Sequence, residues 1–215
     1  MNLSSVNRFT LRSKLYAFFI AFVFVSPIAI ADSQSPAETV VKTTVNKLVN
    51  NIQTNRALYK SNTQALYDMV ENTLVPAIHV QRMSNLILGK SARRATQEQK
   101  VAFANEFKTF LIRSYATALL DYTGDQKVNY FPVEAAPGAD KVAVRGELIS
   151  SSGQAYPISL FMSNRKDTSW RAYNMDVAGI NFVSTYRATF GEIIAAKGVD
   201  GLINDLKQKN AKLAS

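Results

Sequence analysis

The sequence predicts an α+β fold in which helices pack on an antiparallel sheet. Apolar residues recur at helical spacing over the first half of the chain beyond residue 35. From Gln126 to Val177 the spacing shifts toward two, with turn-forming residues between the segments, and helical spacing returns after Gly179. Helices, then about four strands, then two more helices indicate one layered domain, with the last helices on the same sheet.

The first 31 residues have the three-part pattern of a secretory signal peptide. Arg8, Arg12 and Lys14 precede an apolar run over 15–30, and Ala29 and Ala31 supply the small residues that a signal peptidase recognises. The run is shorter than the roughly 20 residues that a bilayer span needs. We therefore expect cleavage after Ala31, with residues 32–215 forming a single domain in an aqueous exported compartment.

The next segments predict three helices. Ser35-Pro36-Ala37-Glu38 combines an N-cap residue, a proline at the first helical position and a capping-box glutamate, and the helix that follows is expected to end near Arg56. Apolar spacing predicts a second helix over 65–74, which Pro76 ends or bends before a third over 78–88.

The longest periodic segment begins at a second capping box, Thr96-Gln97-Glu98-Gln99, and continues to Tyr122. Its apolar arc is wider than one packed neighbour requires. Strands are then expected over 128–133, 142–148, 156–162 and 170–177. A helix over 182–196 closed by Gly198, and a last one capped by Asp200 and ending at Leu206, complete the prediction.

The residues that most catalytic and metal sites use are scarce. The chain has no cysteine, which excludes disulfides, thiol nucleophiles and thiolate metal sites, and its single histidine, His79, excludes multi-histidine metal sites. Acidic residues are dispersed along the chain. We therefore assign no catalytic residue, metal site or cofactor, and keep a hydrolase with two carboxylates brought together by folding as an alternative.

The charge is moderately basic. The chain has 25 basic and 16 acidic residues, and removal of residues 1–31, which hold three basic and no acidic residues, leaves a net charge of +6. This balance favours anionic surfaces, and an export signal argues against nucleic acid as a partner. Lys90, Arg93 and Arg94 form the sharpest basic cluster, either a docking patch or a solvated loop.

From Leu66 to about Leu206 the sequence resembles the MlaC family, the periplasmic phospholipid-binding component of the Mla pathway, also called the toluene-tolerance family. The resemblance rests on the order and spacing of several motifs: Val75-Pro76, Leu86-Ile87-Leu88-Gly89-Lys90, Ala95-Thr96-Gln97-Glu98-Gln99 with Phe103, Phe107, Leu111 and Tyr115, Trp170-Arg171-Ala172-Tyr173-Asn174-Met175 with Gly179 and Tyr186-Arg187, and Lys197-Gly198-Val199-Asp200-Gly201-Leu202-Ile203. Family members usually carry aspartate where this chain has Asn174, which puts only a charge-dependent role of that position in doubt.

The resemblance implies a strongly curved antiparallel sheet, with the acyl chains of a phospholipid in an apolar cavity between sheet and helices. Under this reading the candidate lipid-binding residues are Leu74, Phe107, Phe110, Leu111, Tyr115, Ala118, Leu119, Val142, Val144, Leu148, Ile158, Leu160, Met162, Tyr173, Met175, Ile180 and Val183.

The resemblance also implies a monomeric periplasmic carrier that is not an enzyme. Its docking partners would be an outer-membrane lipoprotein and porin complex and an inner-membrane ABC transporter whose periplasmic part is a lipid-binding MCE ring. The helical stripe alone favours a filled core over a ligand cavity, so a secreted α+β binding or scaffold domain without lipid remains open as an alternative.

Overall fold

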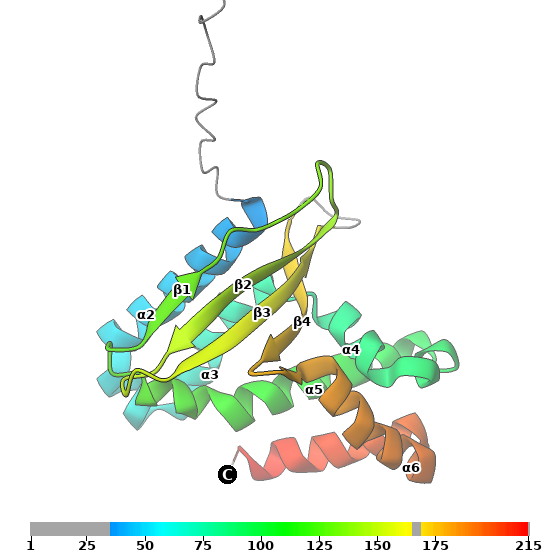
Figure 1. Ribbon diagram of the computed structural model, residues 1–215. Helices are drawn as coiled ribbons and strands as arrows, with labels where there is room; N and C mark the ends of the chain where they lie inside the picture. The colour runs from blue at the N-terminus through cyan, green and yellow to red at the C-terminus, as the bar shows by residue number, and fades with distance from the viewer. Residues whose placement is uncertain (1–34, 165–168, 215) are drawn as a thin grey trace, which may run out of the picture. The chain divides into compact units, whose positions relative to one another are not determined.

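The computed structural model describes residues 35–164 and 169–214 (Figure 1). The predicted signal peptide, residues 1–31, lies outside the described residues. Within them, no helix is long and apolar enough to cross a bilayer. The helices are α2 (Pro36–Ser61), α3 (Thr63–Leu74), α4 (Val80–Leu88), α5 (Gln97–Tyr115) and α6 (Phe182–Lys212), with 3-10 turns η1 (Val75–Ala77), η2 (Gly89–Arg93) and η3 (Ala116–Asp121).

Helix α2 begins where the sequence predicts but continues beyond Arg56. The Ser35 Oγ accepts a hydrogen bond from the Glu38 backbone N–H at 3.2 Å, as an N-cap does. The chain leaves helical geometry at Asn55 and then resumes the helix to Ser61, so the expected end near Arg56 is a kink. The side chain of Asn62 then caps α3.

The predicted capping box of α5 is present. The backbone N–H of Thr96 donates to the Gln99 Oε1 at 2.9 Å, and the Gln99 N–H donates to the Thr96 Oγ1 at 3.2 Å. The α-helix ends at Tyr115, seven residues earlier than expected, and the chain continues as η3. Arg56 explains how this segment is held, since its guanidinium donates hydrogen bonds to the carbonyl oxygens of Leu120 and Tyr122.

The strands form an antiparallel meander in the order β1-β2-β3-β4-β5. They are β1 (Lys127–Tyr130), β2 (Lys141–Ile149), β3 (Ala155–Ser163), β4 (Arg171–Val177) and β5 (Ile180–Asn181). The four expected strands are confirmed, and β5 is too short to produce a period in the sequence. It forms because Ala178 and Gly179 adopt φ values of 52° and 82°, which turn the chain sharply after Val177.

A β-bulge at Tyr173 shifts the register between β3 and β4. Leu160 pairs with Met175, whereas Met162 pairs with Ala172, so that Tyr173 has no partner in the ladder. Because directly paired residues lie on one face of a sheet, Ala172 and Met175 share a face despite their odd spacing. That face is the one that the helices cover.

Three clusters of buried side chains hold the elements together. The N-terminal half of α2 packs on the sheet through Ala37 and Val41, next to Val144, Met162, Ala172 and the half-buried Trp170. The C-terminal half of α2 packs with α3 and η3 around Ile52, Leu66 and Ile112. The third cluster joins α4, α5 and α6.

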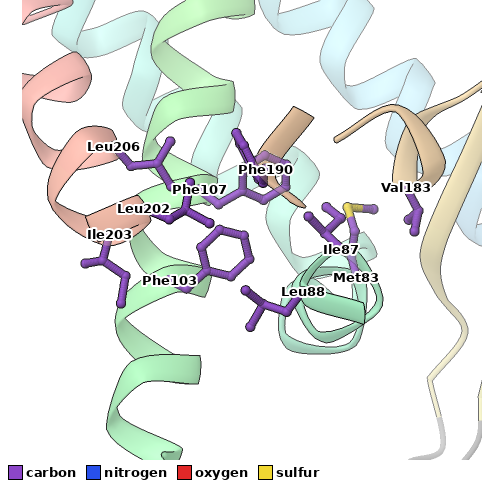
Figure 2. Close-up of a cluster of buried hydrophobic side chains, with 10 residues drawn as sticks. All are labelled: Met83, Ile87, Leu88, Phe103, Phe107, Val183, Phe190, Leu202, Ile203 and Leu206. Atoms are coloured by element: carbon purple, nitrogen blue, oxygen red, sulfur yellow. The ribbon is translucent and has the colours of Figure 1, made fainter. Parts of the chain in front are cut away.

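The third cluster corrects the prediction that the last helices lie on the sheet. The segment 182–212 is one element broken at Gly198, where φ is 71°, and it packs chiefly against α4 and α5 (Figure 1). Figure 2 shows Phe103 and Phe107 of α5 facing Phe190 and Leu202 of α6. The apolar residues of α6 therefore serve a helical layer, and only its first turns lie near β4.

Candidate functional site

The third cluster contains the packed rings of Phe103, Phe107 and Phe190 and is called the aromatic cluster. An apolar cavity of about 660 Å³ lies beside it, between the helices and the β4–β5 end of the sheet. This volume is within the range of roughly 300–1,000 Å³ that ligand pockets occupy. The lining residues come from α3, η1, the following loop, α4, α5, η3, β4, the β4–β5 turn, β5 and α6: Val70, Leu74, Val75, Ile78, Val80, Met83, Ser84, Phe107, Lys108, Leu111, Ile112, Tyr115, Ala116, Leu119, Met175, Val177, Ala178, Ile180, Phe182, Thr185 and Tyr186.

Helix α4 reaches the cavity because the chain before it is pinned to β4. Ile78 forms a parallel bridge with Ala172, and the His79 backbone N–H donates to the Ala172 carbonyl oxygen at 2.8 Å. The lone histidine thus lies at the start of α4 and is not among the cavity-lining residues. Pro76 lies in the 3-10 turn that redirects the chain from α3 to this position.

The lining carries few polar groups. Lys108 is the charged residue among those described around the cavity, and its ammonium pairs with the Glu71 carboxylate of α3. The Ser84 hydroxyl is fully buried and has no hydrogen-bond partner in the described part of the chain. No carboxylate is among the described residues that line the cavity, and no three His, Asp or Glu side chains of residues 35–164 and 169–214 gather as a metal site would require.

Exposed lining residues mark the mouth of the cavity. Tyr115 is 56% exposed and Ile180 is 66% exposed, and Thr185 on the first turns of α6 is exposed as well. In contrast, Phe107 is only 1% exposed and closes the cavity from within. The sharp β4–β5 turn places Ile180 at this rim, where a large apolar side chain faces solvent.

Two tyrosines join α5 to α6 at the mouth. Their hydroxyl oxygens, on Tyr115 and Tyr186, are 2.9 Å apart and share a hydrogen bond. Burial raises the pKa of Tyr186 above its usual range, and the hydrogen bond and charge interaction with Tyr115 raise it further. Tyr186 therefore remains a neutral phenol at physiological pH.

Some residues proposed from the sequence line this cavity and others lie elsewhere. Those that line it are Leu74, Phe107, Leu111, Tyr115, Leu119, Met175 and Ile180. Around them the structure adds residues that the sequence did not single out, among them Ile78, Met83, Phe182 and Tyr186. Met83, Phe182 and Tyr186 lie on helices that the sequence predicts, but apolar spacing does not tell which of several neighbouring elements each side of a helix faces.

The proposed sheet residues lie on the helix-facing side but mostly outside the cavity. Directly paired positions place Val142, Val144, Leu148, Ile158, Leu160 and Met162 on the same face as Met175. Most of this face belongs to the α2 cluster, which contains Val142, Val144, Leu160 and Met162, and only its β4 end borders the cavity. The alternation of a strand identifies the covered face, but it does not tell which helix covers each part.

The remaining proposed residues also lie outside the lining. Phe110 packs against Phe107 and Tyr186, and Val183 is buried in the third cluster. The ring of Tyr173 lies 3.9 Å from the guanidinium carbon of Arg82, and Ala118 is exposed on η3. The shift from α-helix to 3-10 helix at Ala116 explains the last case, because it changes which side chains face inward.

A family model described as the MlaC protein matches residues 42–208. The chain belongs to the MlaC family. The match covers most of the described chain and includes every element that lines the cavity.

Curated relatives agree with the MlaC assignment. The toluene tolerance protein Ttg2D of Pseudomonas putida is 30% identical over 191 residues, covering 88% of this chain and 85% of its own. The intermembrane phospholipid transport system binding protein MlaC of Haemophilus influenzae is 25% identical over 202 residues, covering 91% and 94%. A phospholipid-binding protein from Ralstonia solanacearum, solved in complex with a phospholipid, matches with a TM-score of 0.75 and 29% identity, over 84% of this chain and 100% of its own.

The side chain of Asn174 has a structural role. Its Oδ1 accepts hydrogen bonds from the backbone N–H groups of Met175 at 2.9 Å and Val183 at 3.1 Å. Its Nδ2 donates to the Oδ1 of Asn181, the N-cap of α6, at 3.3 Å. The side chain thus ties β4 to the start of α6 beside the cavity, and a neutral amide suffices for it.

The basic residues proposed for docking lie apart from the cavity lining. Lys90 and Arg93 of η2 and Arg94, which directly follows it, are all exposed. Nearby, the Arg187 Nε donates to the Leu86 carbonyl oxygen at 2.8 Å, which fixes the turn to α6. The three charges are therefore presented to solvent from a turn that is anchored at its base.

Proposed function

We propose that this protein is a carrier that holds one phospholipid by its acyl chains and moves it between membranes. The observation that carries the proposal is the apolar cavity of about 660 Å³ with an exposed mouth, in a chain of the MlaC family. Two relatives, an intermembrane phospholipid transport binding protein and a protein solved in complex with a phospholipid, support the same assignment. It is a binding protein and not an enzyme, as the family assignment indicates.

The free-energy cost of moving a free phospholipid through water is large. Two acyl chains expose about 30 methylenes, and each costs about 0.8 kcal/mol in water, so the total is on the order of 20 kcal/mol. Free diffusion of the lipid is negligible at that cost. A cavity that offsets it releases lipid very slowly into water, so delivery requires a partner that offers a continuous apolar path.

Lipid extraction tests the proposal directly. The chain is expressed with its export signal, purified without detergent and extracted with organic solvent, and the extract is analysed by mass spectrometry. We expect about one intact diacyl phospholipid per protein. A clean extract from a folded sample would favour the filled-core alternative, and conversion of added phospholipid to lysolipid and fatty acid would favour the hydrolase.

We propose a periplasmic location, with export through cleavage after Ala31. The family assignment and the sequence pattern of residues 1–31 support it. Fractionation followed by intact-mass measurement tests it, with a periplasmic product that begins at Asp32 as the expected result. A product that keeps residues 1–31 and sediments with membranes would contradict it.

We also propose that the protein exchanges lipid with an outer-membrane lipoprotein and porin complex and with an inner-membrane ABC transporter carrying an MCE ring. The exposed charges of Lys90, Arg93 and Arg94 would speed docking on an acidic partner surface. Exchange of all three for glutamate should slow association at low salt, and the difference should shrink as salt rises, because exposed charges are screened over about 8–10 Å. Equal association rates at low salt would indicate that Lys90, Arg93 and Arg94 belong to a solvated turn with no part in docking.

A further inference from the structure

The cavity determines where the charged part of a bound lipid must lie. The lining is almost entirely apolar, and burial of an ionised group without partners is very costly. A phospholipid held by its chains therefore keeps its phosphate at the mouth, next to Tyr115, Ile180 and Thr185. Polar recognition of the charged phosphate therefore has to come from side chains at this rim.

The polar side chains near the mouth differ in whether they still have a hydrogen to donate to a ligand. The Thr185 hydroxyl donates to the Asn181 carbonyl oxygen at 2.9 Å, and the Lys108 ammonium is directed to the Glu71 carboxylate. The Tyr115 and Tyr186 hydroxyls share a single hydrogen bond, which uses one of their two hydrogens. One phenolic hydrogen of the pair remains to donate to a ligand.

Within the pair, the Tyr186 ring is packed in position before any ligand arrives, and Tyr115 is tied to it by the shared hydrogen bond. The Tyr186 ring lies 4.8 Å from that of Phe182, 5.0 Å from Phe107 and 5.4 Å from Phe190, measured between centroids. Since the raised pKa of Tyr186 keeps its hydroxyl protonated, Tyr186 can donate either to Tyr115 or to a ligand. A fixed donor loses little conformational freedom when it binds, which increases its contribution to affinity.

We propose that the paired hydroxyls of Tyr115 and Tyr186 bind an oxygen of the lipid's glycerophosphate region, a phosphate oxygen or an ester carbonyl, and so set how deeply the lipid enters. This inference rests on the proposed carrier function. It predicts recognition that does not depend on the headgroup substituent, because the groups recognised are common to all diacyl phospholipids.

Phenylalanine substitutions test the proposal, because they remove the hydroxyls and keep the rings. Dissociation constants are measured for delipidated parent, Tyr115→Phe, Tyr186→Phe and the double variant, with phosphatidylglycerol displacing a fluorescent phospholipid. We expect the double variant to bind about tenfold more weakly, the cost of one hydrogen bond to a charged or carbonyl oxygen. Tyr156→Phe is the matched control, since Tyr156 is 41% exposed on β3 and is not a lining residue.

Diacylglycerol distinguishes the two possible oxygens, because it keeps the esters and lacks the phosphate. A tenfold effect that disappears with diacylglycerol supports a phosphate contact, and an equal effect supports an ester contact. If the double variant binds phosphatidylglycerol like the parent and only melts at a lower temperature, the pair is a structural link between α5 and α6 and the proposal is overturned. Parent protein that takes up no phospholipid overturns the carrier function itself.

Discussion

The aromatic cluster and the cavity are neighbours of similar polarity, but the side chains of the cluster are close-packed whereas those around the cavity leave a space of about 660 Å³ between them. Helix α5 contributes to both, through Phe103 to the cluster and through Leu111 to the cavity, and Phe107 belongs to each. In the cluster, α6 approaches α5 closely enough for the ring of Phe190 to meet those of Phe103 and Phe107 edge-on (Figure 2). The backbone arrangement, and not side-chain polarity, decides which apolar region is core and which can hold a ligand.

Substitution of Phe103 in the filled region should have the largest effect on stability. Phe103 is fully buried and stacks against Phe107 at 5.7 Å between centroids, so Phe103→Ala leaves a hole that close-packed neighbours cannot fill. We expect a loss of about 3–5 kcal/mol in the free energy of unfolding of the delipidated protein, measured by urea denaturation. A loss below about 1 kcal/mol would show that this region is loosely packed, and would remove the contrast with the cavity.

Enlarging a side chain in the cavity wall should affect lipid content far more than stability. Leu111 is half-buried and lines the cavity, so in Leu111→Trp the indole can occupy space that acyl chains would fill. We expect reduced copurifying phospholipid, while the free energy of unfolding of the delipidated protein changes by less than about 1.5 kcal/mol. Delipidated samples are essential, because bound lipid itself raises the melting temperature.

Ala118→Trp is the matched control for Leu111→Trp, since Ala118 is exposed on η3 and is not a lining residue. It should change neither lipid content nor stability. Full lipid content in Leu111→Trp together with marked destabilisation would indicate that Leu111 packs in core.

Removal of the Arg56 hydrogen bonds that hold η3 should have an intermediate effect on stability. Arg56→Met keeps the apolar stem and removes the two hydrogen bonds to the carbonyl oxygens of Leu120 and Tyr122. We expect a loss of about 1–3 kcal/mol in the free energy of unfolding, with faster lipid release because η3 supplies Ala116 and Leu119 to the cavity wall. Arg145→Met, at an exposed position on β2, should leave both quantities unchanged.

Removal of the charge in the cavity wall should have the smallest effect. Lys108 and Glu71 form an ion pair with 24% and 48% of their side chains exposed, and such pairs contribute about 0–1 kcal/mol. Lys108→Met should therefore change the free energy of unfolding by less than about 1 kcal/mol and leave the lipid dissociation constant near that of the parent. A tenfold weaker affinity for phosphatidylglycerol would instead assign phosphate recognition to Lys108.

The sequence predicted most elements because their signals are local. The Thr96 capping box, the Gly198 break and the alternation of β2 to β4 each depend on a few adjacent residues. The predicted end of α5 was wrong because apolar spacing from Tyr115 to Tyr122 looks the same in an α-helix and a 3-10 helix. The hydrogen bonds that hold η3 come from Arg56, which is over 60 residues away in the sequence. The packing of α6 on α4 and α5 is likewise a long-range property.

The candidate site was only partly visible in the sequence for the same reason. The α5 residues Phe107, Leu111 and Tyr115 do line the cavity, since a wide apolar arc serves more than one neighbour. Val144 and Met162 have the same pattern as Met175, yet α2 covers them. A strand's alternation carries no information about where along its length a helix ends and a cavity begins.

The position of the single tryptophan has a spectroscopic consequence. Trp170 packs in the cluster between α2 and the sheet and is not a lining residue of the cavity. Intrinsic fluorescence in the parent protein therefore reports the melting of the α2 layer and is insensitive to cargo. Leu111→Trp adds a second emitter at the cavity wall, and because its indole is expected to displace lipid, its emission should show whether the cavity holds the indole or residual lipid.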